Sequence, residues 1–225
     1  MTATLAFLLH STIPQIQEAS LELVRTHSGK KVQYHNDWEQ KIEDTLQAVC
    51  VDIENNRHSE AIDSALTKIN SILGNDCDSQ KSSINMFALL LSRFLIHGPV
   101  NVRLTLELHT ALAIAFNNSG RFGEAFAAAT ATEQILVRRS LTVFDDQDYD
   151  DYLRYLAIVQ QAVALYCTSK YSRTLGKLQE AGLLIKPDSP CFTAYQIFKT
   201  SVALQIKTQP KVAPENLSEN DEYLC

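Results

Sequence analysis

The most chemically suggestive stretch of this sequence is the acidic run DDQDYDD. Asp146, Asp148 and Asp150 stand at the first, third and fifth positions of a calcium-binding loop. Such a loop needs glycine at its sixth position for a sharp turn and a bidentate glutamate at its twelfth. Those two positions hold Asp151 and Ala157. The calcium pattern therefore fails where its geometry is strictest. We expect Asp150 and Asp151 instead to begin a helix and to stabilise its positive end.

The histidines and cysteines are the other side chains that could bind a metal or take part in catalysis. The six histidines include no pair at i, i+4, the spacing at which a helix presents two ligands to one ion. They are His10, His27, His35, His58, His97 and His109. The five cysteines lie far apart and form no C-x-x-C motif: Cys50, Cys77, Cys167, Cys191 and Cys225. With no strong catalytic motif either, the sequence assigns no catalytic, cofactor-binding or metal-binding residue, and we expect a non-enzyme.

Several of these residues have a simpler structural interpretation. Cys50 and Cys167 lie within apolar helical patterns, where a thiol behaves as a small hydrophobic group. His58 and His97 lie near predicted helix ends, where they can satisfy terminal backbone groups. Widely spaced thiols indicate reduced cysteines, hence an intracellular protein, cytoplasmic with the nucleus as the alternative. The glycosylation pattern that begins at Asn117 is then a chance match.

The charge distribution limits the classes of partner. The formal net charge is −6, and no block of lysines and arginines interrupts it. This argues against nucleic-acid binding, which requires a concentrated basic surface. No apolar run approaches the roughly 20 residues that a membrane-spanning helix needs. No small-molecule substrate is implied. We expect the partners to be other proteins.

The 225 residues include only 7 glycines and 6 prolines, which favours a mostly helical chain over an all-β fold. Apolar residues recur at helical spacing and predict about nine helices. The first covers about 13–27, the fourth 83–97 and the ninth about 191–206. The third carries apolar residues at the spacing of one buried face: Ile62, Ala65, Leu66, Ile69, Ile72 and Leu73. We expect a loose N-terminal strip over 1–12, one helical domain over 13–207, and a disordered acidic tail over 208–225.

A short motif recurs between these predicted helices. NRHSEA begins at Asn56, GRFGEA at Gly120 and SKYSRT at Ser169. Each contains, in this order, a small or turn-forming residue, a basic residue, a residue with a ring, a small residue and a charged residue. The first position must tolerate the left-handed backbone conformation, which suits Gly and Asn better than Ser. The ring can fill the space between the two helices. The motif therefore predicts three similar bends, although an ordinary helical bundle with similar turns is the alternative.

The region around Gly120 resembles a tetratricopeptide unit. It carries small and aromatic residues at that family's spacing: Ala113, Phe116, Gly120, Phe122 and Ala125. The unit lacks an aromatic residue at His109 and a proline near Val137. The bends are 64 and 49 residues apart, whereas a regular array repeats about every 34. The resemblance implies an all-α, irregular helical-repeat fold, in a right-handed stack.

A second resemblance covers residues 88–116, ALLLSRFLIHGPVNVRLTLELHTALAIAF. This segment is similar to the helical arm of PCI-type scaffold subunits, found in the proteasome lid, the COP9 signalosome and translation initiation factor three, including its m subunit. The corresponding residues are 91–94 and 99–103, and the hairpin at 160–184 stands at a comparable place in order. Such subunits close with a winged-helix module, and this chain ends in a polar tail. It is either a truncated arm or a member of another helical-repeat family.

These resemblances imply a non-catalytic scaffold or adaptor that docks to other subunits of a large intracellular complex, of the translation-initiation or proteasome-lid kind. A tetratricopeptide-type module that binds a peptide or a chaperone is the alternative. It would place basic or Asn side chains along one concave face. An all-helical enzyme is the third class, and it would need a pocket where His or Cys meets a carboxylate. The sequence does not identify the partner-binding residues.

Overall fold

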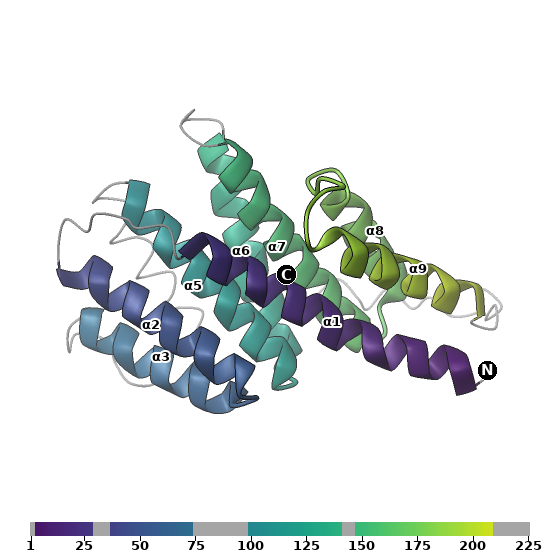
Figure 1. Ribbon diagram of the computed structural model, residues 1–225, viewed down its shortest axis with the longest axis horizontal. Helices are drawn as coiled ribbons and strands as arrows, with labels where there is room; N and C mark the ends of the chain where they lie inside the picture. The colour runs from purple at the N-terminus through teal and green to yellow at the C-terminus, as the bar shows by residue number, and fades with distance from the viewer. Residues whose placement is uncertain (1–2, 29–36, 74–98, 141–146, 209–225) are drawn as a thin grey trace, which may run out of the picture.

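The computed structural model describes residues 3–28, 37–73, 99–140 and 147–208, and all regular secondary structure in these ranges is α-helical (Figure 1). The described helices are α1 (Ala3–Ser28), α2 (Asp37–Glu54), α3 (His58–Leu73), α5 (Pro99–Asn118), α6 (Phe122–Ser140), α7 (Gln147–Cys167), α8 (Tyr171–Ala181) and α9 (Phe192–Thr208). The predicted all-α class is thus confirmed for this part of the chain. The helix expected over 83–97 and the tail over 209–225 lie outside the described residues.

Six of the described helices form three hairpins, α2–α3, α5–α6 and α7–α8. The two helices of each hairpin pack against each other. The first hairpin contacts the second through α5, and the second contacts the third through α7. Helix α9 then packs on α8, and α1 packs on α9, α5 and α2. Figure 1 shows α2 and α3 side by side at one end and α8 and α9 at the other.

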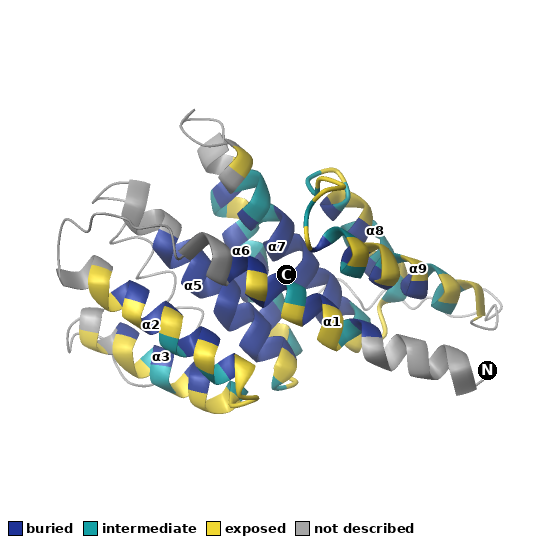
Figure 2. Ribbon diagram, viewed as in Figure 1, coloured by how far each residue is buried: buried dark blue, intermediate teal, exposed yellow. Residues whose placement is uncertain are grey.

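Helices α5 and α7 form the centre of the molecule, where Figure 2 shows the most continuous burial. Every side chain of α5 from Leu104 to Asn117 is buried, as is every side chain of α7 from Tyr155 to Leu165. A helix covered on all sides buries polar groups together with apolar ones. These polar groups need partners, because an unpaired polar group in the interior is costly.

The outer helices show the one-sided burial that their sequences predict. On α3, Ile62, Ala65 and Ile69 are fully buried, whereas Asp63, Thr67 and Lys68 are exposed. This spacing is that of a single apolar stripe on a helix. Each buried aliphatic side chain of this kind contributes about 1.5–3 kcal/mol to stability. The sequence pattern therefore determines which face of α3 meets the core.

The N-terminal helix differs from expectation. It begins at Ala3, ten residues before the predicted start at 13, so it includes most of the strip expected to be loose. Most of its first residues, ATLAFLL, are Ala or Leu, which are strong helix formers. Pro14 lies inside the helix without ending it. Proline removes one backbone hydrogen bond and disfavours a helix interior. The packing of the following residues, with Ile16 and Val24 fully buried, offsets that cost.

Candidate functional site

The three bends between paired helices share one backbone geometry. Asn56, Gly120 and Ser169 have positive φ angles of 57°, 78° and 62°. This left-handed conformation costs an ordinary residue about 1–2 kcal/mol, and glycine adopts it freely. Ser169 adopts it although serine suits it less well than glycine or asparagine. Each of the three residues stands at the first position of the recurring motif.

The hydrogen bonds at the bends repeat in the same register. The basic residue that follows each left-handed position donates its backbone N–H to the carbonyl five residues earlier. The N···O distances are 2.8 Å for Arg57–Asp52, 2.8 Å for Arg121–Phe116 and 2.9 Å for Lys170–Leu165. Such bonds satisfy carbonyl groups that the end of a helix leaves unpaired. The bends are therefore equivalent in structure, and each turns the chain into a helix that packs against the previous one.

The ring of the motif behaves as predicted at two of the bends. Phe122 and Tyr171 are partly buried and pack against the core. The guanidinium of Arg121 also lies 4.8 Å from the ring centroid of Phe116, on the preceding helix. The third ring, His58, begins α3 at the positive end of that helix, where an imidazolium is not stabilised. Burial lowers the pKa of His58.

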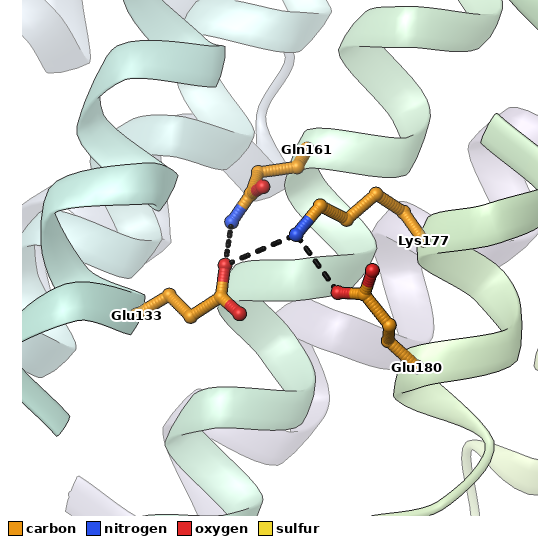
Figure 3. Close-up of polar contacts among 4 residues, drawn as sticks. All are labelled: Glu133, Gln161, Lys177 and Glu180. Carbon is orange, nitrogen blue, oxygen red and sulfur yellow. Dashed lines mark hydrogen bonds and ion pairs between the residues drawn. The ribbon is translucent and has the colours of Figure 1, made fainter. Parts of the chain in front are cut away.

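A cluster of four polar side chains connects the second hairpin to the third, and we call it the interhairpin clamp (Figure 3). Glu133 on α6 lies at its centre. Its Oε2 atom accepts a hydrogen bond from Gln161 Nε2 on α7 at 2.7 Å and is 3.4 Å from Lys177 Nζ on α8. Lys177 also donates to Glu180 Oε2 at 2.8 Å. One carboxylate thus joins three helices.

The clamp is sheltered enough for its contacts to contribute to stability. The side chains of Glu133 and Lys177 are 15% and 24% exposed, whereas that of Glu180 is 52% exposed. Hydrogen bonds to charged groups are stronger than those between neutral groups, and partial burial reduces screening by water. The pair Glu133–Lys177 is therefore the more sheltered ion pair of the cluster, although its N···O distance is longer. The surface pair Lys177–Glu180 contributes little.

Two buried polar pairs connect the central helix α5 to its neighbours. His109 Nδ1 lies 2.8 Å from Thr132 Oγ1 on α6. Asn117 Nδ2 donates to the backbone oxygen of Gln160 on α7 at 3.1 Å and to its Oε1 at 3.0 Å. Burial of the His109 imidazole lowers its pKa to about 4. His109 is therefore neutral at physiological pH. The Asn117 side chain is held inside the protein, which agrees with a chance glycosylation match.

The described part of the acidic run lies at a helix start as predicted, although α7 begins at Gln147, three residues before the expected start at Asp150. Asp148 and Asp150 belong to the first turn of α7, near the positive end of the helix dipole. Asp148 is exposed and accepts a hydrogen bond from Lys186 at 3.0 Å. Asp146 lies outside the described residues. In the ranges that the structure describes, no three His, Cys, Asp or Glu side chains gather in a way that could hold a metal ion.

The described cysteines occupy two environments. Cys50 and Cys191 are buried thiols that form no disulfide bond, and Cys50 lies in the apolar core as predicted. The same prediction for Cys167 is wrong. This residue is the last of α7, next to the third bend, and its side chain is exposed. Burial raises the pKa of the Cys191 thiol to about 12.

Sequence reasoning did not single out the residues of the clamp or the Asn117–Gln160 pair. Glu133 and Gln161 are 28 residues apart, and Asn117 and Gln160 are 43 apart. No periodicity connects positions on different helices. One sequence signal for the clamp is the i, i+3 spacing of Lys177 and Glu180, which is common for ion pairs on exposed helix surfaces. A polar residue inside an otherwise apolar helix, such as Gln160, is the other available hint.

Comparison with known proteins gives no match: no family model fits the chain, and no curated protein or solved structure is significantly similar to it. The resemblances to tetratricopeptide and PCI-type proteins stay predictions. Of the helices in the described ranges, none is sufficiently long and apolar to cross a lipid bilayer. The geometry above is therefore the basis for assigning a function.

Proposed function

We propose that this chain is a non-catalytic scaffold whose stacked helical hairpins dock to other protein subunits. The observation that carries the proposal is the equivalence of the three bends. Asn56, Gly120 and Ser169 share a left-handed conformation, and the following residues share one hydrogen-bond register. Repeated hairpins that pack on their neighbours form an extended surface on which several partners can be held at fixed positions.

The polar side chains that connect neighbouring helices support a structural role for these groups. Glu133 pairs with Lys177 and accepts a hydrogen bond from Gln161, and the His109 ring contacts the hydroxyl of Thr132. These groups hold helices in register, and they bond to one another across helix boundaries. A general base needs a positioned proton donor and access to a substrate. The buried, neutral His109 is placed for packing.

Membership of an assembly of the translation-initiation or proteasome-lid kind rests on the resemblance of residues 88–116 and stays a prediction. The docking function itself is independent of that resemblance. It requires only that the stack be rigid and that its outer surface meet other proteins. Rigidity follows from the buried pair Asn117–Gln160 and from the interhairpin clamp, which fix α5, α6, α7 and α8 relative to one another.

The test is purification of the tagged full-length chain from cells, followed by size-exclusion chromatography, cross-linking and mass spectrometry. We expect the chain to elute in a complex with subunits in fixed stoichiometry. Cross-links should form from exposed lysines such as Lys68 on α3, Lys170 at the third bend and Lys207 on α9. The lysines that cross-link identify the docking end of the stack. Elution as a monomer with no stoichiometric subunit would refute the scaffold proposal.

A further inference from the structure

Helix α1 lies outside the three hairpins and covers elements that are distant from it in sequence. It packs along α9 and α5, with a smaller contact to α2, and Figure 1 shows it running diagonally in front of the stack. One of its contacts joins residues 172 positions apart: the Cys191 thiol donates to the backbone oxygen of Ala19 at 3.1 Å. Helix α1 therefore covers a surface formed by helices from both ends of the described chain.

The described part of α1 is buried on most sides. From Thr12 to Val24, the only exposed positions are Pro14, Gln15, Glu18 and Glu22, which form one narrow stripe. The apolar residues of the buried face include Ile16, Leu21, Leu23 and Val24. Exposure along one narrow stripe shows that α1 sits between neighbouring helices. The surface beneath it thus already accommodates a helix.

The fit of α1 to this surface has one specific defect. Gln17 is buried, and among the described residues neither its amide nitrogen nor its amide oxygen has a hydrogen-bond partner. A buried amide without a partner has lost its bonds to water and gained none in return. Ser20 is buried too, and its hydroxyl bonds to the Ile16 carbonyl of its own helix at 2.7 Å. That bond adds nothing across the interface.

We propose that α1 is a releasable internal ligand, and that the surface it covers on α9, α5 and α2 is the docking site for an amphipathic helix of a partner protein. The occupant of the site in this structure defines the chemistry of that partner. It is a helix with an aliphatic stripe like that of Ile16, Leu23 and Val24, and with an apolar residue at the position of Gln17. Such a helix fills the same surface without burying an unpaired amide, so each of its contacts with that surface is at least as favourable as that of α1.

This inference rests on the proposed scaffold function and adds a regulatory step to it. The docking site is closed while α1 is seated and becomes available when α1 leaves. The apparent affinity of the partner helix is reduced by the fraction of molecules in which the site is closed. Any change that seats α1 more firmly therefore weakens partner binding, and it does so without altering a residue of the docking surface.

The opening of α1 can be measured in the full-length chain through a native cysteine. Cys191 is fully buried and its thiol bonds to the Ala19 oxygen, so movement of α1 exposes it to an alkylating reagent. Cys167 at the end of α7 is exposed and provides a reference rate in the same molecule, with the pKa of its thiol raised by partial burial. We expect Cys191 and the amides of α1 to lose protection together, at least about tenfold faster than the amides of α5, as expected for a locally opening unit.

The matched variants are Gln17→Leu and Gln15→Leu, which place the same residue at a buried and an exposed position of one helix. We expect Gln17→Leu to slow labelling of Cys191 by about fivefold to a hundredfold, in line with removal of a buried unpaired amide. Gln15→Leu should leave the rate unchanged. If Gln17→Leu fails to fold, Gln17→Met offers a flexible side chain of similar length for the same measurement.

The docking site itself is tested with a fluorescent synthetic peptide of residues 3–28 that carries Gln17→Leu. We expect this peptide to bind the wild-type full-length chain, and to bind the Gln17→Leu chain more weakly by the same factor that slows labelling. Protection of α1 equal to that of α5, or equal peptide binding to both chains, would overturn the inference.

A chain that co-purifies with subunits while α1 stays closed refutes this inference alone. A chain that opens and binds the peptide but recruits no subunit refutes the scaffold function alone.

Discussion

The buried imidazole of His109 makes the stability of this protein depend on pH in a predictable direction. His109 is fully buried on α5, with its Nδ1 atom 2.8 Å from the Thr132 hydroxyl on α6. Burial lowers its pKa from 6.5 to about 4, because the charged imidazolium is poorly solvated in the interior. In the unfolded chain the same group titrates near its ordinary value, so acid favours the unfolded state.

The direction follows from proton counting. Between pH 6.5 and pH 4, the unfolded chain binds a proton at His109 and the folded chain does not. The contribution of neutral His109 to stability is therefore complete above pH 6.5 and is lost as the pH falls toward 4. A difference of about 2.5 between the two pKa values corresponds to about 3 kcal/mol once the loss is complete. At pH 5 the expected loss is about 2 kcal/mol.

The assay is urea unfolding of the wild type and of His109→Gln at pH 7.5 and pH 5.0. Glutamine does not titrate, and its amide can meet the Thr132 hydroxyl. All other acid-sensitive groups, including the partly buried His58, are common to both chains and cancel in the comparison. We expect the wild type to lose about 2 kcal/mol more than His109→Gln between the two pH values. This difference isolates the effect of His109 protonation on the free energy of unfolding.

Equal losses in the two chains would refute the reasoning, because His109 would then titrate alike in the folded and unfolded states. If His109→Gln does not fold, NMR titration of the wild type gives the same answer. The His109 ring protons should then shift only below about pH 5, near the lowered pKa of about 4. A midpoint near 6.5 would show that the imidazole is solvated.

Further predictions concern the bends, a helix end and the clamp. Ser169→Gly should stabilise the protein by about 0.5–1 kcal/mol in urea unfolding, because glycine relieves the strain of a positive φ of 62°; a loss of stability would contradict the strain. Gly182→Ala should lower the free energy of unfolding by about 1–3 kcal/mol, because the new Cβ atom would collide with the Tyr195 hydroxyl that donates to the Leu178 oxygen. Gly176→Ala is the matched control, because its Cβ atom would meet no atom within 4 Å, and it should raise stability by about 0.5–1 kcal/mol. Equal effects of the two alanines would contradict the contact. A double-mutant cycle on Glu133 and Lys177 should give a coupling free energy of about 0.5–1 kcal/mol that falls at high salt. A coupling near zero would show that water screens this ion pair.

The local features of this fold could be predicted from the sequence because each depends on residues that are near one another in the chain. Helical periodicity predicted the all-α class and the buried face of α3. The motif that begins at Asn56, Gly120 and Ser169 marked all three bends, since a left-handed residue at a helix end is a local requirement. The start of α1 was missed by ten residues because Pro14 resembles a helix boundary, and only tertiary packing shows that the helix continues past it.

Only the tertiary structure decided which polar side chains meet. The partners Glu133 and Lys177 are 44 residues apart, and Cys191 and Ala19 are 172 apart, so no spacing rule connects them. The seating of α1 on α9 and α5, with Gln17 buried among them, has the same origin. The sequence determines where helices form and which face of each is apolar, because those depend on short-range hydrogen bonding and periodicity. Which faces meet depends on how all the helices pack together, and that choice belongs to the folded molecule.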